Sequence, residues 1–314
     1  MNIVFFGSAN FAVPSFKSLL GSGHKVACVV TQPDRQKGRG LHLTETVIKQ
    51  IAQEAGLKIH QPSRINLPQE IEILKKLNPD LFIVVAYGQI LSQDLLDIPR
   101  IFSVNVHASL LPRYRGAAPI NRALINGDKV TGITVIKMAK EMDAGPIILQ
   151  KSLEINKDDT VITLEDKLSH LAAEALLSTL ESVENRNYSL TAQDQGKVSL
   201  APKLKKEDGL INWGKTAQEI YNLIRGCVNW PGAITYYKGK LLKLYKAKVL
   251  EFLSSGVLGS PGEIIQVSKG GIIVATGGGN LQIEELQLEG KRRMKVEEFI
   301  RGNKICVGEV FREK

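Results

Sequence analysis

The chain has 314 residues, of which 43% are hydrophobic and 23% are charged, and its formal net charge is +9. This composition is typical of a globular protein long enough for two domains. No apolar run approaches the roughly 20 residues that span a bilayer, so we expect no membrane partner. The cysteines Cys28, Cys227 and Cys306 are far apart, which excludes a disulfide framework or a ligand-spaced metal site. The N-terminus shows no basic leader, and we expect a cytoplasmic protein.

The positive charge is concentrated in the last third of the chain. Residues 1–200 hold 22 basic and 20 acidic side chains, whereas residues 201–314 hold 19 and 12. A basic C-terminal region predicts a polyanionic partner, nucleic acid first and an acidic membrane second. A basic surface without any partner is the alternative at this point.

Apolar runs alternate with helical patterns along residues 1–188. The runs are continuous, which indicates parallel strands buried on both faces. Strands are expected at 3–6, 26–31, 57–60, 81–86, 102–107, 132–137 and 146–150, and helices from Pro14 and at 45–55, 68–77, 120–126 and 160–184. The order predicts an α/β domain with a Rossmann-like, mostly parallel sheet and helices on both faces. Gly7-Ser8-Ala9 is not a G-x-G-x-x-G fingerprint, so we infer no dinucleotide.

The character of the sequence changes after residue 188. Residues 189–208 are polar and basic without an apolar period, which predicts an interdomain linker. A helix is then expected at 217–225, short strands broken by glycine at 233–237, 241–249, 262–267, 271–275 and 281–287, and a last helix at 296–301. Short antiparallel strands of this kind favour a small OB-like β-barrel. The predicted domains are 1–188 and 209–314, joined by the linker 189–208.

Two loops have compositions that point to binding. The loop Asp34–Gly40 places three cations, Arg35, Lys37 and Arg39, among glycines, which favours phosphate; a solvated loop is the alternative. The second loop, Tyr87-Gly88-Gln89-Ile90-Leu91, leaves the end of a strongly apolar strand. Ligands of open parallel sheets bind outside such strand ends. The stretch 109–119 leaves another strand end, so we expect these two loops to be neighbours.

Asn105 and His107 lie two residues apart on one predicted strand and therefore share a face. An amide donor beside an imidazole can hold the oxygen of a reacting carbonyl and handle a proton. Asp143, in a later connection, is a carboxylate that could orient the imidazole and favour its charged form. Ser109 lacks a G-x-S-x-G elbow, which argues against a serine hydrolase. His170 is expected on a helix surface.

The combined motifs resemble the 10-formyltetrahydrofolate-dependent formyltransferases. Asn105-Val-His-Ala-Ser-Leu-Leu-Pro112 matches the Asn-x-His and Ser-Leu-Leu-Pro signature of that family, and Met142-Asp-Ala-Gly-Pro146 matches its downstream aspartate motif. The extension Arg113-Tyr-Arg-Gly-Ala-Ala-Pro119 is similar to that of the methionyl-tRNA formyltransferases in particular. The N-terminal strand, the loop 32–40, the strand end at 86–88 and the basic C-terminal region agree, so the resemblance covers nearly the whole chain.

The resemblance implies roles for individual residues. Asn105, His107 and Asp143 match the catalytic trio. The folate-binding residues implied are Ser109, Leu110, Leu111 and Pro112, with Tyr87, Gly88, Gln89, Ile90 and Leu91 lining the pterin pocket. The tRNA-binding residues expected are Arg35, Lys37 and Arg39 in the acceptor-stem loop and Lys203, Lys205 and Lys206 in the linker. Thr44–Lys49 lacks the proline that the family usually has there, so the start of the next helix is open.

The activity implied is formyl transfer from 10-formyltetrahydrofolate to the α-amine of initiator methionyl-tRNA, with tetrahydrofolate as product. The amine would attack the formyl carbon directly, Asn105 and protonated His107 would stabilise the oxyanion, and Asp143 would orient His107. No metal is expected, and the chain is expected to act as a monomer.

Other functions remain open on the sequence alone. Glycinamide ribonucleotide formyltransferase shares the Asn-x-His and Asp motifs but is normally about two-thirds of this length. Sugar-nucleotide formyltransferases and formyltetrahydrofolate hydrolases can carry a second domain. A non-catalytic RNA-binding protein would explain the basic barrel but not Asn105, His107 and Asp143.

Overall fold

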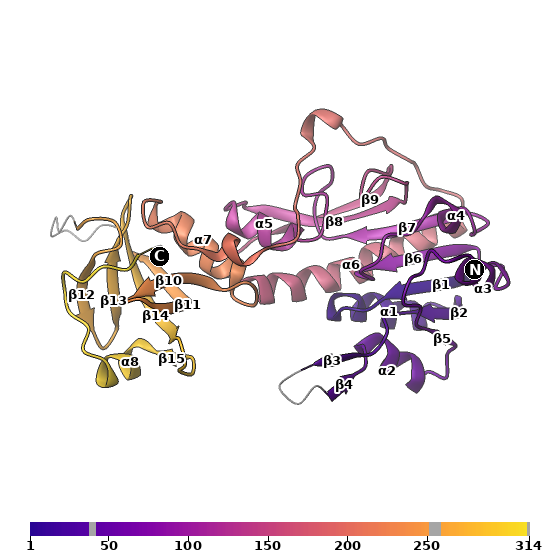
Figure 1. The fold of residues 1–314 in the computed structure, drawn as a ribbon. Helices are drawn as coiled ribbons and strands as arrows, with labels where there is room; N and C mark the ends of the chain where they lie inside the picture. Colours follow the sequence, from indigo (N-terminus) through magenta and orange to yellow (C-terminus); the bar gives the residue numbers. More distant parts are fainter. Residues whose placement is uncertain (38–41, 251–258, 313–314) are drawn as a thin grey trace. The chain divides into compact units, whose positions relative to one another are not determined.

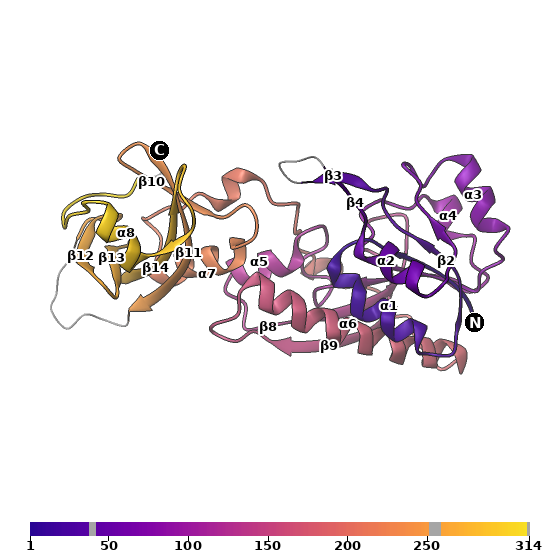
Figure 2. The ribbon, with the colours of Figure 1, turned by 90° about the horizontal axis from the view of Figure 1, so that it is seen from below.

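The computed structural model describes residues 1–37, 42–250 and 259–312. The chain forms two compact units, which we call unit 1 and unit 2 (Figures 1 and 2). Unit 1 contains Met1–Pro119, Val130–Glu154 and Glu165–Pro202, and unit 2 contains Ile120–Lys129, Ile155–Leu164 and Lys203–Lys314. Among the described helices, none is both long and apolar enough to cross a membrane.

A seven-stranded sheet forms the centre of unit 1, in the order β5-β2-β1-β6-β7-β8-β9. The pairs from β5 to β7 are parallel, and β8 pairs antiparallel with both β7 and β9. The predicted mostly parallel α/β sheet is therefore confirmed. Its strands are β1 (Asn2–Gly7), β2 (Lys25–Val30), β5 (Ile59–His60), β6 (Leu81–Val85), β7 (Phe102–His107), β8 (Val130–Lys137) and β9 (Ile147–Glu154).

Helices cover both faces of this sheet. On one face, Phe6 and Phe82 share a buried cluster with Leu74 of α3 and Leu95 of α4. On the other face, the ring of Phe5 stacks on Phe16 of α1, with ring centroids 4.7 Å apart, and Figure 2 shows α6 beside α1. Burial on both faces explains the continuous apolar runs. The helices are η1 (Asn10–Ala12), α1 (Val13–Leu20), α2 (Val47–Glu54), α3 (Pro68–Lys75), α4 (Gln93–Leu96) and α6 (Val161–Glu184).

A two-stranded ribbon replaces part of the loop expected at Asp34–Gly40. β3 (Arg35–Lys37) pairs antiparallel with β4 (His42–Thr44), so the expectation of a loop is wrong at residues 35–37. Pairing satisfies the backbone groups of a segment that has no apolar face to bury. Residues 38–41, including Arg39, lie outside the described part of the chain.

The helix that follows begins without the family's proline. Thr46 occupies the N-cap of α2, and its side chain accepts a hydrogen bond from the Lys49 backbone N–H at 3.2 Å. The Lys49 ammonium donates to Asp34 Oδ2 at 2.6 Å, and this bond holds the pKa of the Asp34 carboxyl below its usual value. Thr46 and Lys49 together fix the start of the helix that the sequence left open.

Unit 2 is built on an antiparallel sheet of short strands, as predicted, in the order β10-β11-β14-β13-β12 with β15 beside β14. The last described residues connect the two ends of this path: Tyr236 of β10 pairs with Arg312, and Glu263, just before β12, pairs with Val310. Phe311 between them is buried and stacks on Trp213. The elements are η3 (Lys206–Gly209), α7 (Ala217–Cys227), β10 (Ala233–Tyr237), β11 (Lys240–Leu250), β12 (Ile264–Ser268), β13 (Gly271–Ala275), β14 (Asn280–Leu288), β15 (Met294–Lys295) and α8 (Val296–Gly302).

Two segments that precede α6 or contain its start, Ile120–Lys129 and Ile155–Leu164, belong to unit 2, and buried polar contacts hold them there. Arg225 of α7 is only 5% exposed, and its guanidinium donates to the carbonyls of Asn156 and Asp159 at 3.2 and 3.3 Å. Burial lowers the pKa of this guanidinium. Asn121 of α5 (Pro119–Ile125) donates to the Gly226 carbonyl at 2.8 Å. The predicted first domain, residues 1–188, contains both segments, so the prediction leaves them out of the second domain.

Arg225→Met should lower the free energy of unfolding by about 2–4 kcal/mol, because it leaves several buried carbonyls without a donor. Chemical denaturation of the full chain followed by fluorescence measures the change. Arg301→Met is the matched control, since Arg301 is 72% exposed. Equal denaturation midpoints for the two variants would contradict the structural role of Arg225.

Candidate functional site

The end of β7 presents Asn105 and His107 on one face, as their spacing predicts. β7 lies between the parallel strand β6 and the antiparallel strand β8, with Asn105 opposite Val84 and His107 opposite Thr134. Hydrogen bonds on both sides therefore fix the backbone that carries the two side chains. His107 is 6% exposed and Asn105 is half-buried.

Asp143 reaches these residues from the connection between β8 and β9. Its backbone has φ +53°, in the left-handed region that non-glycine residues seldom adopt. Gly145 allows the chain to turn here, because a Cβ at this position would lie 1.8 Å from the Lys137 carbonyl oxygen. The turn brings the Asp143 carboxylate against β7.

The Asp143 carboxylate lies between the two β7 side chains. Its Oδ1 accepts a hydrogen bond from Asn105 Nδ2 at 3.3 Å, and its Oδ2 lies 3.5 Å from His107 Nδ1. Oδ2 also accepts from the Gly116 backbone N–H at 2.8 Å. The structure thus brings together all three predicted catalytic residues, which are 38 residues apart at most in the chain.

The contacts of His107 assign its protons. Nε2 lies 2.8 Å from the Tyr114 carbonyl oxygen, which can only accept, so Nε2 carries a proton. Nδ1 faces Asp143 and is the ring atom that can gain or release a proton. Asn105 Nδ2 carries two hydrogens, and its bond to Asp143 uses one of them. The site therefore has an imidazole nitrogen and an amide N–H on either side of a carboxylate.

The loop after β7 is fixed from beneath by β8 and β9. Thr134 donates through Oγ1 to the Ser109 carbonyl at 2.6 Å and accepts from the Leu111 N–H at 3.0 Å. Gln150 donates to the Leu111 carbonyl at 2.8 Å. These bonds hold the backbone of the predicted folate segment in one conformation.

The predicted folate residues differ in their exposure. Ser109 is 1% exposed and donates to the Arg113 carbonyl at 2.6 Å, and Leu111 is 3% exposed. Their side chains hold the loop together, whereas Leu110 and Pro112 are half-buried. In the second predicted segment, Tyr87 and Leu91 are buried. Gly88, Gln89 and Ile90 lie at the surface there, with Ile90 64% exposed.

The expected tRNA-binding cations lie in both units. In unit 1, Arg35 is exposed and donates to Gln32 Oε1 at 3.1 Å; Lys37 belongs to β3 through its backbone. In unit 2, Lys203, Lys205 and Lys206 are exposed. The side chains of Arg35, Lys203, Lys205 and Lys206 are therefore accessible to solvent. Arg39 and the side chain of Lys37 lie outside the described part of the chain.

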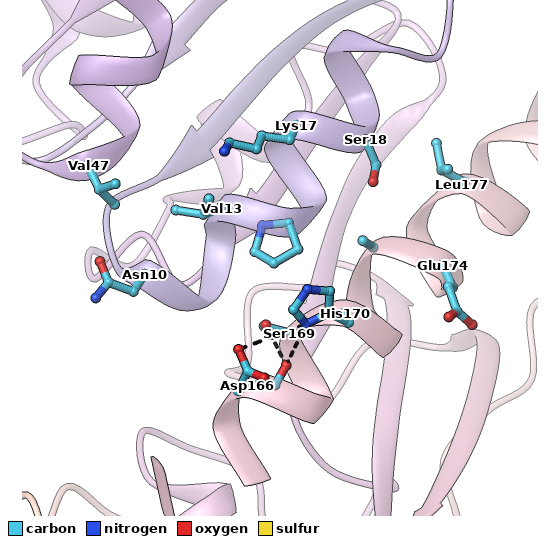
Figure 3. A pocket seen from close by; sticks show the side chains of 12 residues that line it. Asn10, Val13, Lys17, Ser18, Val47, Asp166, Ser169, His170, Glu174 and Leu177 are labelled. Carbon is cyan, nitrogen blue, oxygen red and sulfur yellow. Dashed lines mark hydrogen bonds and ion pairs between the residues drawn. The ribbon is translucent and has the colours of Figure 1, made fainter. Parts of the chain in front are cut away.

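A groove of about 700 Å³ lies elsewhere in unit 1, between α1 and α6 (Figure 3). His170 lies on its wall with a side chain that is 66% exposed, which confirms the expected surface position. Its Nδ1 lies 3.0 Å from the Asp166 carbonyl oxygen. The groove shares no residue with the group around Asp143, so it is not part of that site.

Sequence reasoning missed the side chains that support the trio. Gln193 lies in the segment predicted to be a polar linker, yet it is 6% exposed and donates to the carbonyls of Asp143 and Gly145, both at 2.7 Å. The apolar pattern predicts Thr134 and Gln150 only as strand residues. Their types are ordinary for such positions, so no signal in a single sequence distinguishes them.

Two family models match this chain. "Formyl transferase" matches residues 1–180, and "Formyl transferase, C-terminal domain" matches residues 203–304. The chain belongs to the formyltransferase family. Among curated relatives, the methionyl-tRNA formyltransferase of Geobacter metallireducens is 47% identical over 98% of this chain and 97% of its own. That of Acetivibrio thermocellus is 44% identical over 99% of both chains.

Solved structures of other proteins share the fold of this chain. WlaRD, a sugar 3N-formyl transferase, has a TM-score of 0.67 at 19% identity, over 93% of this chain and 99% of its own. HypX from Aquifex aeolicus, solved with tetrahydrofolic acid, has a TM-score of 0.65 at 16% identity. That comparison covers 98% of the present chain but only 50% of the HypX chain.

Gly145→Ala should reduce formyltransferase activity roughly 100-fold, because the loop must move away from the Lys137 carbonyl and take Asp143 with it. Initial rates at saturating substrate measure the effect. Gly21→Ala is the control: its Cβ would meet no atom closer than the Ser18 carbonyl oxygen at 3.7 Å. If Gly145→Ala is as active as Gly21→Ala, the tight turn does not determine the position of Asp143.

Proposed function

We propose that this formyltransferase transfers the formyl group of 10-formyltetrahydrofolate to the α-amine of initiator methionyl-tRNA. The observation that carries this proposal is the Asn105–Asp143–His107 group at the end of β7, in a chain with full-length methionyl-tRNA formyltransferase relatives. The reaction has a carbonyl carbon as its target and an amine as its nucleophile. Such a reaction needs a donor for the developing oxyanion and a path for the amine proton.

Asn105 and His107 serve the oxyanion in this proposal. The second Nδ2 hydrogen of Asn105 and a proton on His107 Nδ1 can both be donated to the oxygen of the tetrahedral intermediate. Because the two residues are anchored on a paired strand and largely removed from solvent, they need little reorganisation during the reaction. The bond from Nε2 to the Tyr114 carbonyl keeps the ring oriented.

Asp143 handles the proton in this proposal. The methionyl amine attacks as the free base, forms the C–N bond and becomes positively charged. Asp143, directly or through a water molecule, moves this proton towards N10 of the folate, whose bond to the formyl carbon then breaks. Its Oδ2 also lies 3.5 Å from His107 Nδ1, where it orients the imidazole ring.

The two loops at the strand ends are the proposed folate site. Leu110 and Pro112 in one loop, and Gly88, Gln89 and Ile90 in the other, are the members with exposed or half-buried positions. The buried members, Ser109, Leu111, Tyr87 and Leu91, act by shaping the backbone that faces the co-substrate. We propose that the chain carries this reaction as a cytoplasmic monomer with tetrahydrofolate as product.

The basic residues are the proposed tRNA contacts. Arg35 and Lys37 lie on a ribbon that interrupts the α/β pattern, and Lys203, Lys205 and Lys206 open the C-terminal part of unit 2. Exposed cations bind a phosphate backbone through its charge and release its counterions. Family matches along both parts of the chain favour a tRNA substrate over the shorter, single-domain formyltransferases.

Asn105→Ala and His107→Ala should each lower the single-turnover rate of methionyl-tRNA formylation by at least about 100-fold, since each removes a donor to the oxyanion. Thermal midpoints measured in parallel should stay near that of the wild-type chain. His170→Ala, at an exposed histidine of the same unit, should formylate normally. Near-normal rates in both site variants would refute the assignment.

Lys203, Lys205 and Lys206, all replaced by alanine, should weaken tRNA binding and reduce its dependence on salt. Each lost phosphate contact should lower the slope of log affinity against log salt by about 0.7–0.9. Filter binding between low and moderate salt measures the slope. The control replaces Lys58, Lys75 and Lys76, which are also exposed. If the slope equals that of the control, these three lysines do not contact the tRNA phosphates.

A further inference from the structure

Residues 191–201, which we call the strap, lie against the candidate site, although the sequence predicts a linker here. Figure 1 shows them in the long coil that follows α6. Thr191 exchanges two backbone hydrogen bonds with Ile147, of 2.8 and 2.9 Å. Near the other end, Arg115 donates to the Ser199 carbonyl at 2.9 Å and accepts from the Ala201 N–H at 2.7 Å. The strap is therefore paired with both connections that form the site.

Gln193 is the strap side chain that turns inwards. Its Nε2 donates to the Asp143 and Gly145 carbonyls, both at 2.7 Å. Its Oε1 accepts from Arg115 Nε and from a terminal guanidinium nitrogen, at 3.0 and 2.7 Å. One amide thus joins the turn that carries Asp143 to the loop that carries Gly116, the N–H donor to the Asp143 carboxylate.

The chemistry of these four bonds requires an amide. The two carbonyls need a donor, and the guanidinium needs an acceptor. A glutamate at this position could accept from Arg115 but would place a carboxylate oxygen against two carbonyls. A methionine of similar size could make neither set of bonds.

Asp143 needs such support because its backbone is strained. A non-glycine residue in the left-handed region is strained and persists only where its surroundings impose that conformation. Gln193 bonds the carbonyl of Asp143 itself and that of Gly145, which follows it by two residues. The two Gln193 bonds fix the backbone of the turn, and the Gly116 N–H fixes the Asp143 carboxylate.

The strap also contacts the backbone that orients His107. The Ser199 hydroxyl accepts a hydrogen bond from the Tyr114 N–H at 2.9 Å. Tyr114, at φ +63°, presents its carbonyl to His107 Nε2. The strap therefore braces the backbone on which the orientation of His107 depends, as well as that of Asp143.

We propose that Gln193 is a positioning residue for formyl transfer: through its bonds to the Asp143 turn and to Arg115, it keeps the carboxylate in register with Asn105 and His107. This inference rests on the function proposed above. It also gives Arg115, in the motif that follows the folate segment, a defined task as the guanidinium that fixes the amide of Gln193.

The test is single-turnover formylation of methionyl-tRNA by full-length variants. Gln193→Glu keeps the pairing with Arg115 and loses both carbonyl contacts, whereas Gln193→Met loses all four bonds. Both should reduce the rate roughly 10- to 100-fold, as expected for a displacement of about 1 Å, with KM for the folate co-substrate changed less than about threefold. Gln53→Met, at an exposed glutamine of α2 in the same unit, should match the wild-type rate.

A double-mutant cycle with Asp143→Asn separates positioning from general damage. If Gln193 acts through Asp143, adding Gln193→Glu to Asp143→Asn should change the residual rate less than about threefold. Additive losses, or a wild-type rate in Gln193→Glu, would overturn the proposal. A wild-type chain without formyl transfer would instead refute the proposed function and this inference with it. Gln193→Glu also keeps the proposal testable if Gln193→Met fails to fold.

Discussion

The geometry of the site depends on one constraint: the Asp143 carboxylate is held in a position that requires an unfavourable backbone conformation and supporting hydrogen bonds. The connection after β8 leaves the sheet at the level of Ser103, where the Met138 N–H donates to the Ser103 carbonyl. To reach His107 it must curl back along β7. A left-handed residue and a glycine against a carbonyl make this possible. The bonds from Gly116 and Gln193 then make the curled form the stable one.

The sequence was most informative where one side chain pattern serves one element. Continuous apolar runs identified the parallel strands, because burial on both faces leaves no polar positions. The period of two placed Asn105 and His107 on one face without any tertiary information. The chemistry of a carboxylate beside an imidazole suggests Asp143 as their partner, and the resemblance to known formyltransferases supports that choice. The structure adds the physical path, a turn that returns to the level of β7.

The sequence was least informative where polar residues pack in segments that look solvated. Gln193 lies in a stretch without apolar period, and only its bonds to Asp143, Gly145 and Arg115 distinguish it from an exposed glutamine. The sequence does not predict the β3–β4 ribbon for a related reason. Its pairing satisfies backbone groups and leaves no apolar pattern in the sequence. The grouping of 120–129 and 155–164 with unit 2 rests on bonds to α7, which involve residues about 66 to 105 positions apart.

This division of the chain bears on how binding and chemistry can be separated. Among the described residues, the bonds given above for Asp143, His107 and the strap join residues of unit 1. Unit 2, however, includes α5 and the segment before α6, whose carbonyls receive the buried Arg225. A chain that ends before residue 209 would lack Arg225 and Gly226. The groups of α5 and of the segment before α6 that bond these two residues would then be exposed to solvent. Substitutions at surface lysines leave the buried contacts of both units in place, and therefore separate RNA binding from catalysis more cleanly.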